Sequence, residues 1–464
     1  MSDQTNRVNQ VQLEKAHNPL SIWALAAGTI IGFGAFVMPP EFLEAAGPLG
    51  VTLGFIIGAA IMMVVGFNIS AMVKRYPVAG GQFAYAKNEF GSTHAYICGW
   101  MLLLCYVSLI SMNATALGIL GQHLMPEFFT MGYLYTIAGW DVYLPQIVLS
   151  LVCIVLFGVF NRRGGNVAGR IQLVLTLMMV GGIFLIFFGI LASPVSSVAN
   201  LYPAFANEQA PWGGIIAIVA LAPWLFVGFD TVSQSAEEFR FSSNKTLFII
   251  LLAIISGALM YTMVTLGLGM VWPWQEMVAA QHVWAIGTAM EVSVGTVGVA
   301  FLAIAICMGI LTGVNGFYLA GSRLMLAMSR ENIVPKRFGA IHKRYKTPHL
   351  AIILILVVSV IAPFFGRVAI GWVVSMCAVG TAIAYFYTCA AAYKAAKREG
   401  KALGKCMALL GALLSFGILL LLLVPGSPGA MERESWVALL VWIILGVVVY
   451  IRRTGRERHP RDGG

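Results

Sequence analysis

The chain has 464 residues, of which 59% are hydrophobic and only 10% are charged. Soluble globular proteins do not combine so few charges with so many apolar residues, so a soluble fold is excluded and an all-α polytopic membrane protein is predicted. The seven cysteines are scattered and form no CxxC pair, so neither a disulfide framework nor a zinc site is indicated.

Twelve apolar segments, each on the order of 20 residues, are long enough to span a lipid bilayer. They cover residues 21–46, 49–73, 94–120, 144–160, 168–191, 212–235, 246–271, 295–327, 349–365, 369–393, 406–424 and 436–451. The loop 79–93 predicts a short amphipathic helix at the membrane interface, with Phe83, Tyr85 and Phe90 facing lipid.

Basic residues are distributed unevenly between the two sides of this predicted bundle. Of the 29 Lys and Arg residues, only Arg367 and Arg433 fall on one side, and the other 27 fall on the opposite side. This bias puts both tails, residues 1–20 and 452–464, in the cytoplasm. The basic residues lie in short loops and not in one patch, which argues against nucleic-acid binding. Because the first apolar segment does not read as a cleaved signal, we expect a multi-pass protein of the plasma (inner) membrane.

The first apolar segment contains three glycines, Gly28, Gly32 and Gly34, within seven residues. Each glycine costs roughly 1 kcal/mol relative to alanine in a helix interior, so the helix is predicted to be weak here. In a transporter, a broken membrane helix frees backbone groups that bind a ligand at mid-membrane. The alternative is that Gly28 and Gly32 form a small-residue seam against another helix.

The sixth apolar segment contains a second predicted break, marked by Pro223, Gly228 and Asp230. A charged residue near the bilayer centre costs at least about 2.5 kcal/mol, so it usually has a function. Asp230 either takes part in proton coupling or caps the helix that resumes after the break. Two interrupted helices five spans apart predict two inverted five-helix repeats with the site where the breaks meet. The repeats would cover residues 21–193 and 212–393, and residues 394–451 would hold two peripheral helices.

Four stretches of the chain match one common pattern. Residues 28–36 read GTIIGFGAF, residues 75–81 read RYPVAGG, residues 226–230 read FVGFD with AEE following, and residues 323–330 read RLMLAMSR with a later Thr-Pro. In this combination the chain resembles the amino acid–polyamine–organocation superfamily of secondary transporters. The matches cover the first eight spans, whereas the last four match only in hydropathy.

The resemblance implies twelve transmembrane helices, with a five-plus-five repeat core, discontinuous helices 1 and 6, and two peripheral helices. It implies that first-helix N–H groups hold a substrate carboxylate and that sixth-helix carbonyls and an aromatic ring hold an ammonium group. The substrate-binding residues would be Ile30, Ile31, Gly32, Phe33, Gly34, Asn113, Trp224, Phe226, Val227 and Gly228. Asp230 would couple a proton, Glu237 (or Glu238) and Arg323 would form a cytoplasmic gate, and Thr312 and Asn315 would mark an ion site.

Two positions depart from the family pattern. The second-helix Glu of the family is Ala71 here, and a fifth-helix Lys that some members place at the ion site aligns with Met179. The coupling ion therefore stays open, with a proton expected in preference to sodium.

The implied function is secondary active transport of an amino acid or related amine by alternating access, through proton-coupled symport. A substrate exchanger and a non-transporting sensor on the same scaffold are the alternatives. Because the histidines lie in tails, loops or span ends without HExxH spacing, no enzyme, metal centre or cofactor is predicted. The expected partners are a small-molecule substrate and the lipid bilayer, with the chain a monomer or a homodimer.

Overall fold

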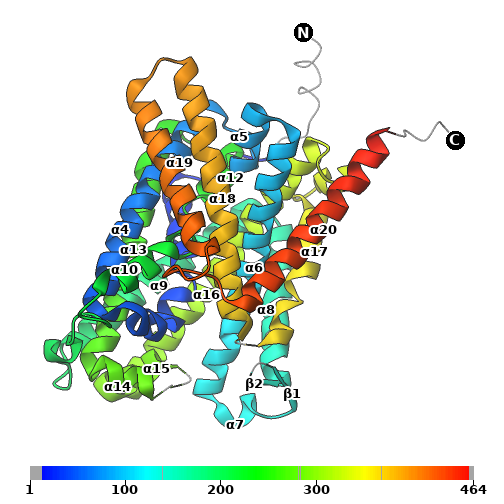
Figure 1. The fold of residues 1–464 in the computed structure, drawn as a ribbon. Coiled ribbons are helices and arrows are strands. Elements are labelled where there is room, and N and C mark those ends of the chain that lie inside the picture. The colour runs from blue at the N-terminus through cyan, green and yellow to red at the C-terminus, as the bar shows by residue number, and fades with distance from the viewer. Residues whose placement is uncertain (1–12, 138, 281, 283, 367, 459–464) are drawn as a thin grey trace.

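The computed structural model describes residues 13–458 except 138, 281, 283 and 367. Helices dominate the described chain, and a small two-stranded sheet lies at one end (Figure 1). The long helices are α4 (Pro39–Arg75), α6 (Ser92–Leu124), α8 (Leu144–Arg162), α9 (Gly165–Leu191), α13 (Thr246–Val271), α16 (Thr296–Arg330), α18 (Val368–Arg398), α19 (Ala402–Leu423) and α20 (Arg433–Arg458).

Among the described residues, ten helices are long and apolar enough to cross a membrane. This confirms a polytopic helical protein, although two of the twelve predicted spans are not among the ten. The sixth predicted span divides into α10 (Pro211–Ala220), α11 (Ala222–Leu225) and α12 (Thr231–Gln234). The ninth forms only α17 (His349–Ser359) and the 3₁₀ turn η5 (Ala362–Phe365). Each of these pieces is shorter than the roughly 20 residues that one membrane-spanning helix needs.

The first apolar segment folds as two helices, α2 (Pro19–Ile31) and α3 (Gly34–Val37). α2 begins after Asn18, whose side-chain oxygen accepts a hydrogen bond from the N–H of Ser21 at 2.8 Å. It ends at Gly32, whose φ of +45° is a conformation that glycine adopts without steric cost. The predicted break in the first helix is therefore present.

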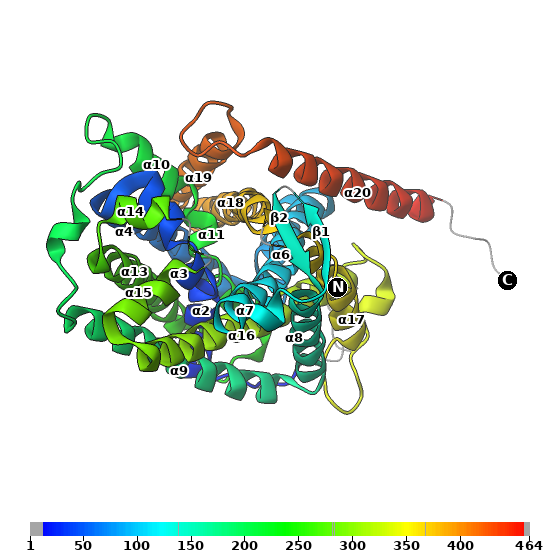
Figure 2. The same cartoon turned by 90° about the horizontal axis from the view of Figure 1, so that it is seen from below.

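The first helix lies at the centre of the bundle, and α20 lies at its edge. α2 packs against α9, α13 and α16, and Figure 2 shows α20 extending away from the other helices. In an 18-residue apolar stretch of the first span, Pro19–Val37, 83% of the residues are buried, against 17% in the corresponding stretch of α20. The outward-facing residues of the peripheral helices are apolar, as a lipid-facing surface requires.

Short elements cover the two ends of the bundle. One end carries α7 (Pro126–Phe129), the antiparallel strands β1 (Tyr133–Ile137) and β2 (Trp140–Tyr143), α14 (Trp274–Ala279) and α15 (Ala285–Val294) (Figure 1). The opposite end carries α5 (Gly81–Phe90). The remaining 3₁₀ turns are η1 (Val198–Leu201), η2 (Ala236–Glu238), η3 (Ser243–Lys245) and η4 (Lys336–Gly339).

The predicted interfacial helix exists as α5, but its predicted orientation is wrong. Phe83 and Tyr85 are completely buried instead of facing lipid, and Phe90 is partly buried against the core. The reason is the glycine pair before the helix: Gly80 and Gly81 adopt φ values of +97° and +43°, and the chain turns inward against α6 and α18. Gly99 on α6 then leaves room for the Phe83 ring, which would lie 3.0 Å from a Cβ at that position.

Candidate functional site

The break in the first helix leaves backbone donors free inside the protein. The N–H of Gly32 still donates to the Gly28 carbonyl at 3.1 Å, and the N–H of Phe33 donates to Asn113 Oδ1 on α6 at 3.2 Å. The next two N–H groups, those of Gly34 and Ala35, have no hydrogen-bond partner in the described part of the chain. Both residues are buried, and a buried unpaired N–H is costly unless a ligand or water satisfies it.

Two aromatic side chains lie directly against this break. A Cβ on Gly34 would lie 2.5 Å from Tyr261 Oη and 3.2 Å from Trp224 Cη2, so a larger residue there would have to displace the Tyr261 side chain. The Tyr261 hydroxyl donates to the carbonyl of Ile30 at 3.2 Å, and this bond satisfies one acceptor at the end of α2. The aromatic rings thus support the interrupted backbone from the side of α11 and α13.

The second break touches the first. Gly228 has a φ of +132°, and a Cβ there would lie 2.4 Å from Thr29 Oγ1 and 2.7 Å from the Ile30 nitrogen. Neither distance is compatible with a side chain, so only glycine allows the two backbones to approach this closely. The two interruptions, five predicted spans apart in the sequence, therefore meet at one place.

The second break also leaves polar groups unpaired. The carbonyl of Val227 has no hydrogen-bond partner among the described residues, whereas the carbonyl of Phe226 accepts from the N–H of Phe229 at 3.5 Å. Trp224 is only 3% exposed and its indole Nε1 has no partner. Its ring lies 6.2 Å from the ring of Phe33, so the unpaired indole N–H lies close to the first break.

Asp230 is completely buried and holds three elements together. Its Oδ1 accepts the N–H of Gly228 at 2.9 Å, and its Oδ2 accepts Gln82 Nε2 of α5 at 3.2 Å and the hydroxyl of Tyr106 on α6. The side chain accepts no capping hydrogen bond from the helix that follows it. The carboxylate therefore satisfies a backbone N–H freed by the break, but it lies at the junction of α5, α6 and the break and does not cap α12.

Tyr106, Gln82 and Tyr261 are polar residues of this site that the sequence analysis missed. Gln82 directly follows the Ala-Gly-Gly of the RYPVAGG run, and its Oε1 also accepts from Ser233 at 3.0 Å and from Gln234 at 2.8 Å. A polar residue next to a glycine pair was the available signal. The two tyrosines carried no signal of this kind, because tyrosine is common in membrane spans.

The residues of the predicted ion site are already hydrogen-bonded to protein groups. Thr312 Oγ1 donates toward the Gly28 carbonyl at 3.0 Å and the Gly309 carbonyl at 2.6 Å. Asn315 donates to Gln172 Oε1 at 2.9 Å and accepts from Asn161 Nδ2 at 2.9 Å. The two side chains lie on α16 but do not converge on a shared partner. Among the described residues, no group of three or more His, Cys, Asp or Glu side chains could hold a metal ion.

The predicted gate residues are both engaged, but not with each other. Arg323 donates from Nε and Nη2 to the two carboxylate oxygens of Glu238, at 2.7 and 3.0 Å. Glu237 instead pairs with Arg330 at 2.8 Å and accepts the N–H of Leu13 at 3.0 Å. Of the two predicted partners, Glu238 and not Glu237 pairs with Arg323, because the adjacent carboxylates of the tight turn η2 bind different groups.

The pair of Arg323 and Glu238 is buried, with 1% and 2% of each residue exposed. Burial by itself raises the pKa of Glu238, but the guanidinium of Arg323 outweighs it and holds that pKa below its ordinary value. The pair is therefore charged at neutral pH. A buried, charged and bidentate pair can lock two elements together, here η2 and α16.

Comparisons with known proteins show the family of the chain. Residues 18–449 match the amino acid permease family. The chain is 26% identical to a branched-chain amino acid permease of Lactococcus lactis, over 94% of this chain and 93% of that protein. It is 24% identical to a methylthioribose transporter of Bacillus subtilis, over 94% of this chain and 93% of that protein. It is 22% identical to an arginine/ornithine antiporter of Latilactobacillus sakei, over 80% of this chain and 77% of that protein.

The family match covers nearly the whole chain, including the last four spans, where the sequence motifs give no signal. The relatives are permeases and not enzymes, as the sequence predicts. The match, the apolar helices and the two touching helix breaks lead to one conclusion: the chain belongs to the amino acid permease family, a family of multi-pass membrane transporters within the amino acid–polyamine–organocation superfamily.

Proposed function

We propose that this permease takes up a neutral amino acid with an apolar side chain by proton-coupled symport and alternating access. The observation that carries the proposal is the contact of Gly228 with Thr29 and Ile30, with unpaired polar groups on both sides of it. Backbone groups freed at the point where two broken helices meet are the usual substrate site of transporters with inverted repeats. The proposal includes the twelve-helix, five-plus-five architecture, with residues 21–193 and 212–393 as the repeats.

Each end of an amino acid has a complementary group at the breaks. The free N–H groups of Gly34 and Ala35 suit a carboxylate, and the free carbonyl of Val227 suits an ammonium group. Phe33 and Trp224 supply an apolar wall. A neutral, apolar side chain is favoured because the one acidic group described at the breaks, Asp230, already accepts three hydrogen bonds. The relative that transports branched-chain amino acids supports the same substrate class.

We propose that Asp230 carries the proton that is coupled to substrate transport. A carboxylate accepts only, so protonation would turn one of its oxygens into a donor and disturb the bonds from Gly228, Gln82 or Tyr106. Gly228 is the residue that touches the first break, so this change would reach the substrate site directly. A proton is favoured over sodium because the side chains of the predicted ion site, Thr312 and Asn315, are hydrogen-bonded to separate protein groups and do not converge on one point.

The proposed location is the plasma membrane, with both termini in the cytoplasm and the pair of Arg323 and Glu238 at the cytoplasmic end of the pathway. Exchange is the second candidate, because one relative is an arginine/ornithine antiporter. A non-transporting sensor would bind substrate at the same breaks without moving it.

Uptake into proteoliposomes tests the proposal. The purified permease is offered a pooled mixture of amino acids and amines, and accumulated compounds are identified by mass spectrometry with and without an inward proton gradient. We expect one or a few apolar amino acids to accumulate with the gradient. The Asp230→Asn variant keeps the size of the side chain but should abolish the gradient-driven part of the uptake, because an amide cannot take up the coupled proton.

Each other outcome separates the alternatives. Accumulation that needs preloaded substrate and ignores the gradient would establish an exchanger and remove Asp230 from proton coupling. Binding without any uptake would establish a sensor. Uptake of cationic or acidic compounds alone would contradict the apolar substrate class while leaving transport itself intact.

A further inference from the structure

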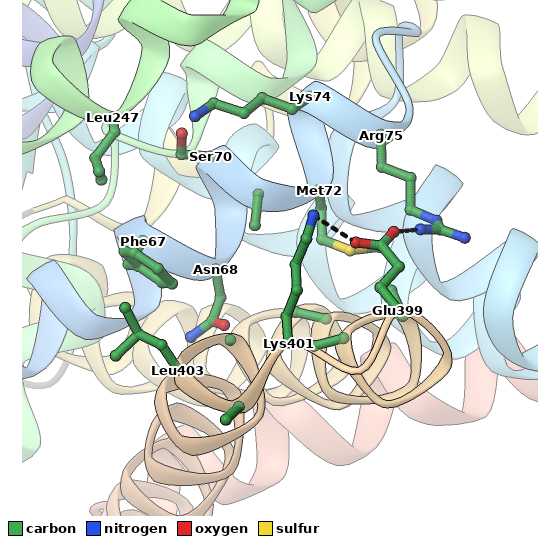
Figure 3. Close-up of a pocket in the computed structure, with 16 residues that line it drawn as sticks. Phe67, Asn68, Ser70, Met72, Lys74, Arg75, Leu247, Glu399, Lys401 and Leu403 are labelled. Atoms are coloured by element: carbon green, nitrogen blue, oxygen red, sulfur yellow. Dashed lines mark hydrogen bonds and ion pairs between the residues drawn. The ribbon is translucent and has the colours of Figure 1, made fainter.

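A cavity of about 630 Å³ lies where the ends of α4, α18 and α19 meet (Figure 3). None of the residues that line it belongs to the helices that carry the two breaks, so it is separate from the proposed substrate site. The lining residues are Phe67, Asn68, Ser70, Ala71, Met72, Lys74, Arg75, Leu247, Ala392, Ala395, Ala396, Glu399, Lys401, Ala402, Leu403 and Gly404.

One end of the cavity is positively charged. The lining contains Lys74, Arg75 and Lys401 but a single acidic residue, Glu399, so it has three positive charges and one negative charge. Arg75 and Lys401 both pair with Glu399, and Figure 3 shows them approaching its carboxylate from two sides. Lys74 has no ion-pair partner within the described ranges, so at least one ammonium group is available to an anion.

The other end of the cavity is apolar. Phe67, Leu247 and Leu403 gather there (Figure 3), and Leu403 is 65% exposed on the outer surface of the bundle. Because an α-helix rises about 1.5 Å per residue, Phe67 lies about 12 Å deeper along α4 than Arg75. The cavity therefore reaches from the charged end of a membrane-spanning helix into the region that acyl chains occupy.

A buried hydroxyl group between these two ends lacks a partner. Ser70 is 2% exposed and lines the cavity, yet its Oγ has no hydrogen-bond partner in the described structure. The neighbouring Asn68 differs, since its Nδ2 donates to the carbonyls of Val64 at 2.9 Å and Met407 at 3.0 Å and so joins α4 to α19. The Ser70 hydroxyl is thus an unpaired hydrogen-bond donor beside the basic residues. Buried donors are normally hydrogen-bonded, so an acceptor is expected in the cavity.

We propose that this cavity binds the phosphate of an anionic phospholipid, with the headgroup between Lys74 and Lys401 and the acyl chains over Phe67 and Leu403. The phosphate oxygens would accept from Ser70 and from the basic side chains. Basic pockets between transmembrane helices are the places where anionic headgroups bind. A soluble phosphate ion has the same anionic chemistry, but it would gain nothing from the apolar end of the cavity.

Native mass spectrometry with mixed lipids tests this site. The purified full-length protein is equilibrated in detergent with equal amounts of phosphatidylglycerol and phosphatidylcholine, and the bound lipids are counted. We expect the unmodified protein to retain phosphatidylglycerol in preference. Each basic residue near an anionic headgroup contributes about fivefold to the affinity, so Lys74→Gln with Lys401→Gln should lower phosphatidylglycerol binding about 25-fold.

Two further variants keep this test specific. Lys336→Gln with Lys343→Gln removes the same charge from exposed positions away from the cavity and should leave the preference unchanged. Ala71→Trp changes no charge but fills the cavity from an exposed position, so it should abolish the preference without depending on electrostatics.

Three results would overturn the proposal. The first is equal retention of both lipids by the unmodified protein, and the second is an equal loss of binding in the control variant. The third is displacement of phosphatidylglycerol by millimolar inorganic phosphate, which would assign the site to a soluble anion. Failure of phosphate to compete, together with loss of binding in both cavity variants, would support the lipid.

Discussion

Gly228 is the residue at which the two broken helices come closest. Its φ of +132° and the 2.7 Å between a Cβ there and the Ile30 nitrogen both forbid a side chain. We predict that Gly228→Ala lowers the free energy of unfolding by about 1–3 kcal/mol, which is the cost of a strained backbone conformation. The variant should also strongly reduce substrate uptake. Thermal unfolding of the purified protein and proteoliposome uptake measure the two effects.

Gly181→Ala is the matched control for this prediction. Gly181 lies inside α9, and a Cβ there would meet no atom within 4 Å. Alanine is a better helix former than glycine, so this variant should be more stable by about 0.5–1 kcal/mol. If Gly228→Ala proved as stable and as active as Gly181→Ala, the close approach of the two breaks would be disproved.

The sequence could identify single residues of the site better than their partners. Gly228 and Asp230 stand out because glycine and a carboxylate are unfavourable inside a membrane helix. The partners of Asp230 could not be predicted in the same way, since Gln82 and Tyr106 lie 148 and 124 residues away along the chain. The choice between Glu237 and Glu238 depends on the geometry of one 3₁₀ turn, and no sequence pattern reports it.

At the scale of elements, the buried pair of Arg323 and Glu238 joins η2 to α16. Removing one partner of a buried pair leaves an uncompensated charge, so Arg323→Met should cost about 3–5 kcal/mol of unfolding free energy. The double variant Arg323→Met with Glu238→Met should recover most of this loss. Chemical denaturation of the four proteins in this double-mutant cycle measures the coupling.

The exposed pair of Lys87 and Glu331 is the control for that cycle. Its 2.8 Å distance is similar to that of the buried pair, but its side chains are 24% and 45% exposed. Exposed pairs contribute about 0–1 kcal/mol, so the same substitutions there should show little coupling. Equal coupling in the two cycles would mean that burial does not strengthen the Arg323 pair.

The segment before α2 is a second element joined to this pair. The N–H groups of Ala16 and His17 donate to the Glu238 carbonyl at 2.9 and 3.1 Å, and the N–H of Arg240 donates to the His17 carbonyl at 3.0 Å. His17 is 2% exposed, and burial lowers its pKa below the ordinary value of 6.5, outweighing the opposite effect of the Glu238 carboxylate. The docked segment therefore holds a neutral imidazole.

Because of this lowered pKa, the contribution of His17 to folding stability should decrease as the pH falls. A lowered pKa in the folded state means that the unfolded chain binds more protons, so the stability from His17 is complete above about pH 6.5 and is lost as the pH falls below it. We predict that acidification from about pH 7.5 to 5.5 lowers the melting temperature less in His17→Gln than in the unmodified protein. His94→Gln is the control, and an equal change in all three proteins would exclude His17 as the cause.

The sequence could predict the interruptions of elements but not their burial or length. Three glycines in the first span and Pro223 with Gly228 in the sixth were sufficient to locate both breaks, because backbone propensity is a local property. The burial of α5 and the 11 residues of α17 depend on what packs against them. Hydropathy cannot distinguish a residue that faces lipid from one that faces another helix, since both are apolar.

At the scale of the whole molecule, the uneven distribution of charge is the main guide to orientation. Only Arg367 and Arg433 of the 29 basic residues fall on the predicted outer side, and the cavity proposed to bind lipid, with Lys74 and Lys401, lies on the basic side. Positive charge is retained in the cytoplasm during insertion. Orientation therefore decides which leaflet supplies the proposed lipid, and the prediction of cytoplasmic termini can be tested independently of transport.

Labelling of one introduced cysteine at a time tests the orientation. Each cysteine is introduced into a Cys406→Ser variant, in which the exposed native thiol has been removed. Glu208→Cys lies in an exposed stretch before α10 on the predicted outer side, and Lys343→Cys lies in an exposed loop on the basic side. We expect a membrane-impermeant maleimide to label Glu208→Cys in intact cells and to label Lys343→Cys only after permeabilisation. The reverse pattern would invert the protein. The lipid cavity would then face the outer leaflet, and the pair of Arg323 and Glu238 would close the outer and not the cytoplasmic end of the pathway.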